Sequence, residues 1–234
     1  MNFGLNTNHS FFRQQQRAGA AAPERTSVPV GGDGSGDGTP ADSTIPIEIA
    51  GNYNSQDNQI NMAAILKQRN IKFTIPSSTN HATINLLGGE GNDTVGDSGS
   101  HNKITANTMG GADNYFASSN YSHINVNLGS GDDTFYWNNT VGTHATVIGG
   151  DGNDTLNLAG VLEQSGPNKE ISLPAKPRIM GTYEPGQSFR VLFGIGNILT
   201  IDPTTENVVI PNREVPGGDR ETLTLDEFAA WCLS

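Results

Sequence analysis

The fold of this 234-residue chain is decided by a glycine-rich pattern that recurs along the sequence. Its four copies are Leu87-Gly-Gly-Glu-Gly-Asn-Asp-Thr-Val95, Thr108-Met-Gly-Gly-Ala-Asp-Asn-Tyr-Phe116, Asn127-Leu-Gly-Ser-Gly-Asp-Asp-Thr-Phe135 and Ile148-Gly-Gly-Asp-Gly-Asn-Asp-Thr-Leu156. We align the acidic or amide positions Asp93, Asn114, Asp133 and Asp154, which lie 21, 19 and 21 residues apart. A period of this length indicates stacked coils rather than hairpins or βαβ units.

A histidine recurs with the same period. It follows a small polar residue in each repeat, at His81, His101, His123 and His144. We expect these rings to stack in one row along the coils. A transition-metal site is the alternative, but its ligands must converge on one point, whereas a row of four spreads over about 14 Å.

Each repeat also carries two short segments with the alternation of a β-strand, such as 124–128 and 134–137. One repeat cannot bury its apolar side alone, but repeats stacked about 4.8 Å apart can. We therefore predict an all-β fold, a short parallel β-helix (β-solenoid) with coils of about 19 to 22 residues. Its expected interior consists of Ile84, Leu86, Val95, Ile104, Phe116, Ile124, Val126, Phe135, Val147 and Leu156.

The ends of the stack need covers, because unpaired strand edges aggregate. We predict a disordered arm and linker over 1–43 and the solenoid with its N-terminal cap over 44–166. An amphipathic helix over 61–69 is expected as that cap. We assign 167–234 to a C-terminal cap, an antiparallel β-meander followed by a short helix that begins at the capping-box pattern Thr224-Leu-Asp-Glu227.

Composition excludes several classes of protein. The formal net charge is −11 and no cationic stripe is visible, so nucleic acid is not an expected partner. No apolar run reaches the length of a membrane span, about 18 residues. The single cysteine, Cys232, cannot form an internal disulfide. An acidic chain of this kind attracts cations instead.

The segments 88–95 and 149–156 resemble the Gly-Gly-x-Gly-x-Asp-x-apolar-x repeat of hemolysin-type (RTX) calcium-binding proteins. The resemblance covers about 70 residues of the chain. One motif per coil replaces the family's usual two, and the opposite turns are nearly uncharged. The resemblance therefore implies Ca²⁺ along one edge only.

The ions would be held by the glycine, amide and acidic residues of the pattern. These are Gly89, Gly91, Asn92, Asp93, Asp113, Asn114, Asp132, Asp133, Asp151, Asn153 and Asp154. Ca²⁺ takes about 6 to 8 oxygen ligands, and it would remove the repulsion between stacked carboxylates, so folding and ion binding should be coupled. In the alternative, the same turns are corners in which Asn and Asp side chains stack as uncharged ladders with water.

These observations predict a non-catalytic, exported calcium-binding module whose surface acts in adhesion or host interaction, with polysaccharide or a host surface as partner. The N-terminus lacks the apolar stretch of a signal peptide, so a secreted location by another route is expected. The rival is a pectate-lyase-like β-helix enzyme that acts on acidic polysaccharide; Lys103, the only Lys or Arg between 81 and 158, could serve it as a base. Asp202-Pro203 is interpreted as a turn, with self-cleavage as the alternative.

Overall fold

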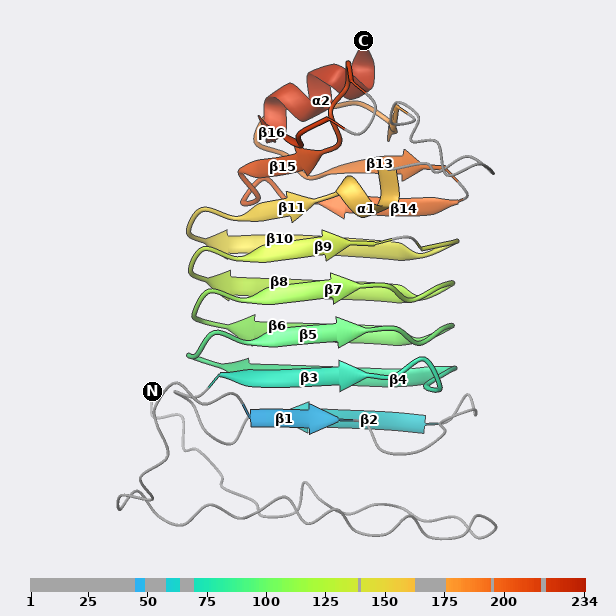
Figure 1. Cartoon of the computed structure of the whole chain (residues 1–234), viewed down its shortest axis with the longest axis vertical. Coiled ribbons are helices and arrows are strands. Elements are labelled where there is room, and N and C mark those ends of the chain that lie inside the picture. The colour runs from blue at the N-terminus through green and yellow to red at the C-terminus, as the bar shows by residue number, and fades with distance from the viewer. Residues whose placement is uncertain are drawn as a thin grey trace, which may run out of the picture. The chain divides into compact units, whose positions relative to one another are not determined.

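The computed structural model describes residues 45–48, 58–63, 70–138, 140–162, 176–194, 196–215 and 218–234 (Figure 1). The predicted arm over 1–43 lies outside these residues. None of the helices in this described part has the length and apolar composition needed to cross a bilayer.

Two eight-stranded sheets make up the fold. The first runs in the order β1 (Ile45–Glu48), β3 (Ile71–Ile75), β5 (Thr94–Asp97), β7 (Asn114–Ala117), β9 (Thr134–Trp137), β11 (Thr155–Asn157), β15 (Asn207–Ile210) and β16 (Glu221–Thr224). The second runs in the order β12 (Arg178–Met180), β13 (Phe189–Phe193), β14 (Asn197–Ile201), β10 (His144–Asp151), β8 (His123–Ser130), β6 (Lys103–Met109), β4 (Ala82–Gly89) and β2 (Asn58–Ala63). The helices are α1 (Ala159–Leu162) and α2 (Leu225–Leu233).

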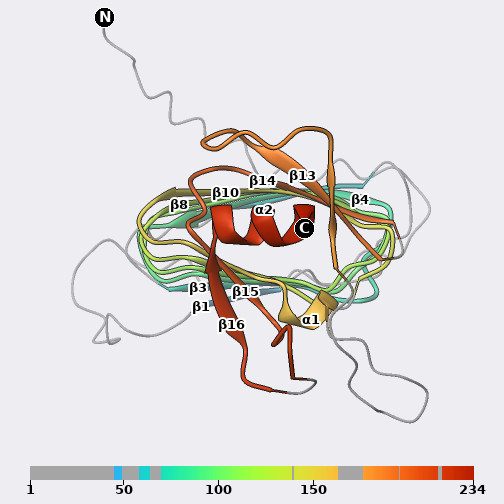
Figure 2. The ribbon, with the colours of Figure 1, turned by 90° about the horizontal axis from the view of Figure 1, so that it is seen from above.

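The central strands of both sheets pair in parallel with the strand one coil away. Each coil contributes a long strand to the second sheet, turns a corner, and contributes a short strand to the first. Seen along the stack, the two sheets face each other and the corners close both sides (Figure 2). The predicted parallel β-solenoid is therefore confirmed.

The interior is built from stacked rows of side chains. Ile84, Ile104 and Ile124 are in register on neighbouring strands and no more than 1% exposed. Nine of the ten predicted interior residues are buried. Phe116 is the exception, since it lies on the outer face and stacks on Tyr136 with ring centroids 4.5 Å apart.

Tyr115 takes the inward position instead, in register with Val95 and Phe135. The error has a simple cause. Successive side chains of a strand point to opposite faces, so an alignment that slips by one residue exchanges inside for outside.

The predicted N-terminal helix is wrong for 61–63, which belong to strand β2; its remainder, 64–69, lies outside the described residues. Ile60 and Met62 are register partners of Ile84 and Leu86 on β4. The apolar spacing of so short a segment fits a helix or a strand, and the open edge of β4 offers a full ladder of backbone hydrogen bonds that favours the strand.

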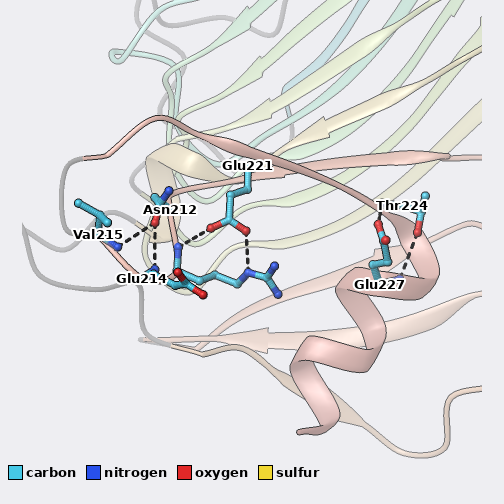
Figure 3. Close-up of polar contacts among 7 residues, drawn as sticks. Asn212, Glu214, Val215, Glu221, Thr224 and Glu227 are labelled. Atoms are coloured by element: carbon cyan, nitrogen blue, oxygen red, sulfur yellow. Dashed lines mark hydrogen bonds and ion pairs between the residues drawn. The ribbon is translucent and has the colours of Figure 1, made fainter.

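The C-terminal strands extend the stack before they close it. β14 and β15 pair in parallel with β10 and β11, while β12, β13 and β16 are antiparallel additions. The predicted capping box is confirmed: Glu227 N–H donates to Thr224 Oγ1, and Thr224 N–H donates to the Glu227 carboxylate (Figure 3). Helix α2 lies across the last coil, where it buries Phe228 and Ala229 (Figures 1 and 2).

Candidate functional site

The candidate site is the corner between each long strand and the short strand that follows it. Four aspartates of successive coils stack there, each 0 or 1% exposed. We call them the aspartate column: Asp93, Asp113, Asp133 and Asp154. They precede register-aligned strand positions such as Thr94, Asn114 and Thr134.

The alignment that put Asn114 in this column is therefore wrong. Asn114 begins β7, is half-buried, and pairs with Thr94 and Thr134, whereas Asp113 fills the column. Met109 is the register partner of Gly89 in the structure, so an alignment that matches Gly110 to Gly89 shifts this copy by one residue. This is the same slip that misplaced Phe116.

Backbone N–H groups hold the column together. Each column residue donates its N–H to the Oδ1 atom of the column residue in the next coil, at 2.6 Å for Asp93 to Asp113, 2.7 Å for Asp113 to Asp133 and 3.0 Å for Asp133 to Asp154. The N–H of Ile71 donates to Asp93 at one end, and the N–H of Asp154 donates to Glu206 at the other, both at 2.7 Å. Every carboxyl group of the column thus fastens its coil to the one before it.

The residues before the aspartates make a second ladder in the opposite sense, which is interrupted at Ala112 because its side chain has no acceptor. The N–H of Ala112 donates to Asn92 Oδ1 at 2.8 Å, and the N–H of Asn153 donates to Asp132 Oδ1 at 3.0 Å. Asn70 receives the N–H of Asn92 in the same way. Each residue of an Asn-Asp or Asp-Asp pair therefore ties its own coil to a different neighbour, which gives the repeated dipeptide a structural role.

The glycines of the pattern make room for this arrangement. Gly89 donates its N–H to Asp93 Oδ2 at 2.9 Å. A Cβ atom on Gly88 would lie 2.3 Å from the same oxygen and 2.6 Å from the Thr108 carbonyl oxygen. Gly111 has a φ of +117°, and a Cβ there would lie 2.4 Å from the Gly91 carbonyl oxygen. Close packing between coils thus requires glycine at these corners.

The second carboxyl oxygen of three column residues has no hydrogen-bond partner. These buried atoms are Oδ2 of Asp113, Asp133 and Asp154. Burial raises the pKa of Asp113 to about 7, and the neighbouring carboxylates add to the effect against the opposing N–H bonds. The same balance raises the pKa of Asp133 and Asp154 to about 6. The column gains stability when it loses negative charge.

The remaining predicted ligands lie on the outside of the corner. Asn92, Asp132, Asp151 and Asn153 are exposed, and Gly91 is half-buried. Among the residues that the structure describes, no three Asp, Glu, His or Cys side chains gather where they could hold a metal ion. In the column itself, Oδ1 is already an acceptor in every carboxyl group, and Gly88 and Gly149 pack against the Oδ2 atoms of Asp93 and Asp154. The carboxyl chemistry suits Ca²⁺, and the N–H donors of neighbouring coils already bind one oxygen of each column carboxyl group.

The histidines form two rows rather than one, so that expectation is wrong. His81 and His101 stack at 4.7 Å between ring centroids, and Tyr121 continues their row at 5.1 Å. All three have a positive φ of 53° to 57°. His123 and His144 belong to another row, in register with Lys103. The sequence spacing does not reveal the two rows, because Tyr121, two residues before His123, occupies the turn position that His81 and His101 occupy in their coils.

Comparison of the chain with protein-family models, with curated proteins and with solved structures finds no match. The resemblance to the RTX repeat therefore rests on the residues of the pattern alone.

Proposed function

We propose that this chain is a non-catalytic β-solenoid module that works by binding a partner on its outer surface, in adhesion or host interaction outside the cell. The observation that supports this proposal is the packed interior of the coils. Inward positions from Ile84 to Leu156 are filled by apolar side chains that are almost fully buried. A ligand of these coils would thus meet an outer face or a corner rather than an internal cavity.

Calcium binding is the second part of the proposal, in a restricted form. Four buried carboxyl groups in one column favour a neutral state, which a proton or a cation can supply. The three unpartnered Oδ2 atoms are the oxygens that Ca²⁺ would use, and the corner would have to open around the ion, because every Oδ1 is committed. We propose that Ca²⁺ competes with protons for the column where calcium is plentiful.

Thermal melts test the calcium proposal. The purified chain is followed by circular dichroism at pH 6 and pH 8 with Ca²⁺, Mg²⁺ or chelator. Competition with protons predicts that Ca²⁺ raises Tm more at pH 8 than at pH 6, and that Asp154→Ala reduces the response. Asp219→Ala, which removes an exposed carboxylate away from the column, is the matched control. A Tm that millimolar Ca²⁺ does not change at either pH would contradict calcium binding, and the column would then have a structural role only.

The length of a polysaccharide after incubation distinguishes the binding module from the rival function, a lyase for acidic polysaccharide. The purified protein is incubated with polygalacturonate and the polymer is sized over time. The binding proposal expects the polymer length to stay constant. Shortening that Lys103→Ala abolishes would support the enzyme instead, since a lyase needs a base to remove a proton.

A further inference from the structure

A row of basic side chains crosses the outer face of the second sheet. Lys103, His123 and His144 are register partners on β6, β8 and β10, and all three are exposed. Arg190 on β13 is also exposed and pairs with Thr200 on β14. Together they line an open groove of about 520 Å³. The groove lies on the sheet, away from the aspartate column.

A second row in the same groove is polar and ends in Arg190, the register partner of Thr200. Asn125 and Thr146 are register partners two residues further along β8 and β10, and Thr200 continues their row on β14. Two residues along a strand span about 7 Å. The groove therefore offers three basic side chains in one row and, in the other, hydroxyl and amide groups that can donate and accept hydrogen bonds, followed by Arg190 on β13.

The charge of the groove opposes that of the chain. The formal net charge is −11, yet no carboxylate is among the lining residues, and all four titratable side chains there are basic. No described carboxylate forms an ion pair with Lys103 or Arg190. His123 and His144 lie with ring centroids 5.0 Å apart. Like charges on adjacent strands repel each other. An anion in the groove would reduce this repulsion, which no carboxylate among the described residues offsets.

The pKa of His144 agrees with this geometry. Burial lowers its pKa first, and the positive charges of His123 and Arg190 lower it further. The charged groups that face the groove come from β6, β8, β10 and β13, and each is a base. An acidic ligand would favour the protonated form of His144, so its binding should strengthen as the pH falls.

We infer that this groove binds an acidic oligosaccharide, with ligand carboxylates beside the basic side chains of both rows and sugar hydroxyls beside Asn125, Thr146 and Thr200. From β6 to β13 the groove crosses four strand spacings, about 19 Å, which exceeds the size of a single free anion. Duplex nucleic acid carries one charge per about 1.7 Å, and the acidic remainder of this chain repels so dense a polyanion. A uronic acid chain carries both carboxylates and neutral hydroxyl groups, which match the basic and the uncharged polar side chains of the groove. This inference rests on the proposed binding function and names its ligand class.

Calorimetric titration at pH 6 tests the inference. The probes are pentagalacturonate, maltopentaose as a neutral oligosaccharide of equal length, and inorganic phosphate. We expect binding of pentagalacturonate, no detectable binding of the other two, and weaker binding at pH 8. Arg190→Gln should weaken the affinity about tenfold, and Lys103→Gln combined with Arg190→Gln should weaken it further. Both side chains are exposed, so a melt should find the variants folded.

Lys72→Gln is the matched control, because Lys72 is exposed on β3 of the opposite sheet and its loss should leave affinity unchanged. Pentagalacturonate binding that is equal in the wild type and the double variant would overturn the groove as the site. The proposed binding function would still hold in that case. Phosphate binding as tight as that of the oligosaccharide, or no binding of pentagalacturonate at all, would overturn the ligand class. Shortening of the pentagalacturonate during the titration would instead contradict the proposed non-catalytic function.

Discussion

The backbone N–H of Asp113 donates to the Oδ1 atom of Asp133, one coil further along the chain, at 2.7 Å. The carboxyl group that accepts this bond is buried, and its other oxygen has no partner. Repeated in successive coils, this contact joins the coils by their corners as well as by their sheets. It also places four ionisable groups where charge is unfavourable, and several consequences for stability follow from that placement.

Stability should rise as the pH falls from 8 to 6. Burial raises the pKa of Asp113 to about 7 and that of Asp133 and Asp154 to about 6, above the usual value of 3.8. The folded chain therefore takes up protons in a range where the unfolded chain does not, and this stabilisation is lost as the pH rises through those values. Each carboxyl group adds at most about 1.4 kcal/mol per pH unit within that window. Urea unfolding at pH 6, 7 and 8 measures it, and a midpoint that rises toward pH 8 would contradict it.

Replacement of Asp133 should separate its hydrogen bond from its charge. Asp133→Asn keeps the side-chain oxygen that accepts the Asp113 N–H and removes the charge, whereas Asp133→Ala leaves that N–H unpaired in the interior. We expect Asn to exceed Ala in stability by about 1 to 3 kcal/mol at pH 8. The Asn variant should also have a shallower pH dependence than the wild type. Urea midpoints of both variants test this, with Asp219→Ala as the surface control.

The pattern glycines should differ sharply in tolerance to a methyl group. Gly88→Ala would place Cβ 2.3 Å from Asp93 Oδ2, with the Thr108 backbone on the other side, so neither neighbour can move freely. We expect a loss of about 1 to 3 kcal/mol or more. Gly96→Ala is the control, since its Cβ meets only one atom, at 3.9 Å, on the outer side of β5. Thermal melts in chelator compare the two, and equal stability would contradict the role of Gly88 in corner packing.

Much of this architecture could be predicted from the sequence, because strand alternation and the repeat period together specify stacked coils. Residues such as Val95 and Phe135 are predicted correctly, because their copies of the pattern keep a glycine at the second position, Gly89 and Gly129. The copy at 108–116 is not, because it lacks the guiding glycine, and a slip of one residue exchanges Asp113 for Asn114 and Tyr115 for Phe116.

The paired ladders and the basic groove could not be predicted in the same way. The Asn92-Asp93 pair accepts N–H bonds from both neighbouring coils, and the sequence of the pair does not reveal the direction of these bonds. Arg190 lies far from Lys103 in sequence and reaches the groove because β13 returns antiparallel to β14. No periodicity within the coils could reveal that contribution.

A carboxyl group outside the column, Asp97, gives an independent test of buried charge. Asp97 ends β5, is 1% exposed, and its Oδ2 atom has no hydrogen-bond partner. Burial raises its pKa to about 7, although the Ser119 hydroxyl and the Gly99 N–H oppose the shift. Asp97→Asn removes the charge at nearly constant volume. We expect this variant to be more stable than the wild type by about 1 kcal/mol or more at pH 8, because an ionised carboxylate is costly there.

The same comparison at pH 5 should give little difference, since the wild-type carboxyl group is then protonated in the folded chain. Urea unfolding of both proteins at the two pH values measures the change, and Asp219→Asn serves as the exposed control. A gain from Asp97→Asn that is equal at pH 5 and pH 8 would mean that packing, rather than charge, sets the energy at this position. A gain confined to pH 8 would identify Asp97 as a second source of the acid stabilisation, separate from the aspartate column.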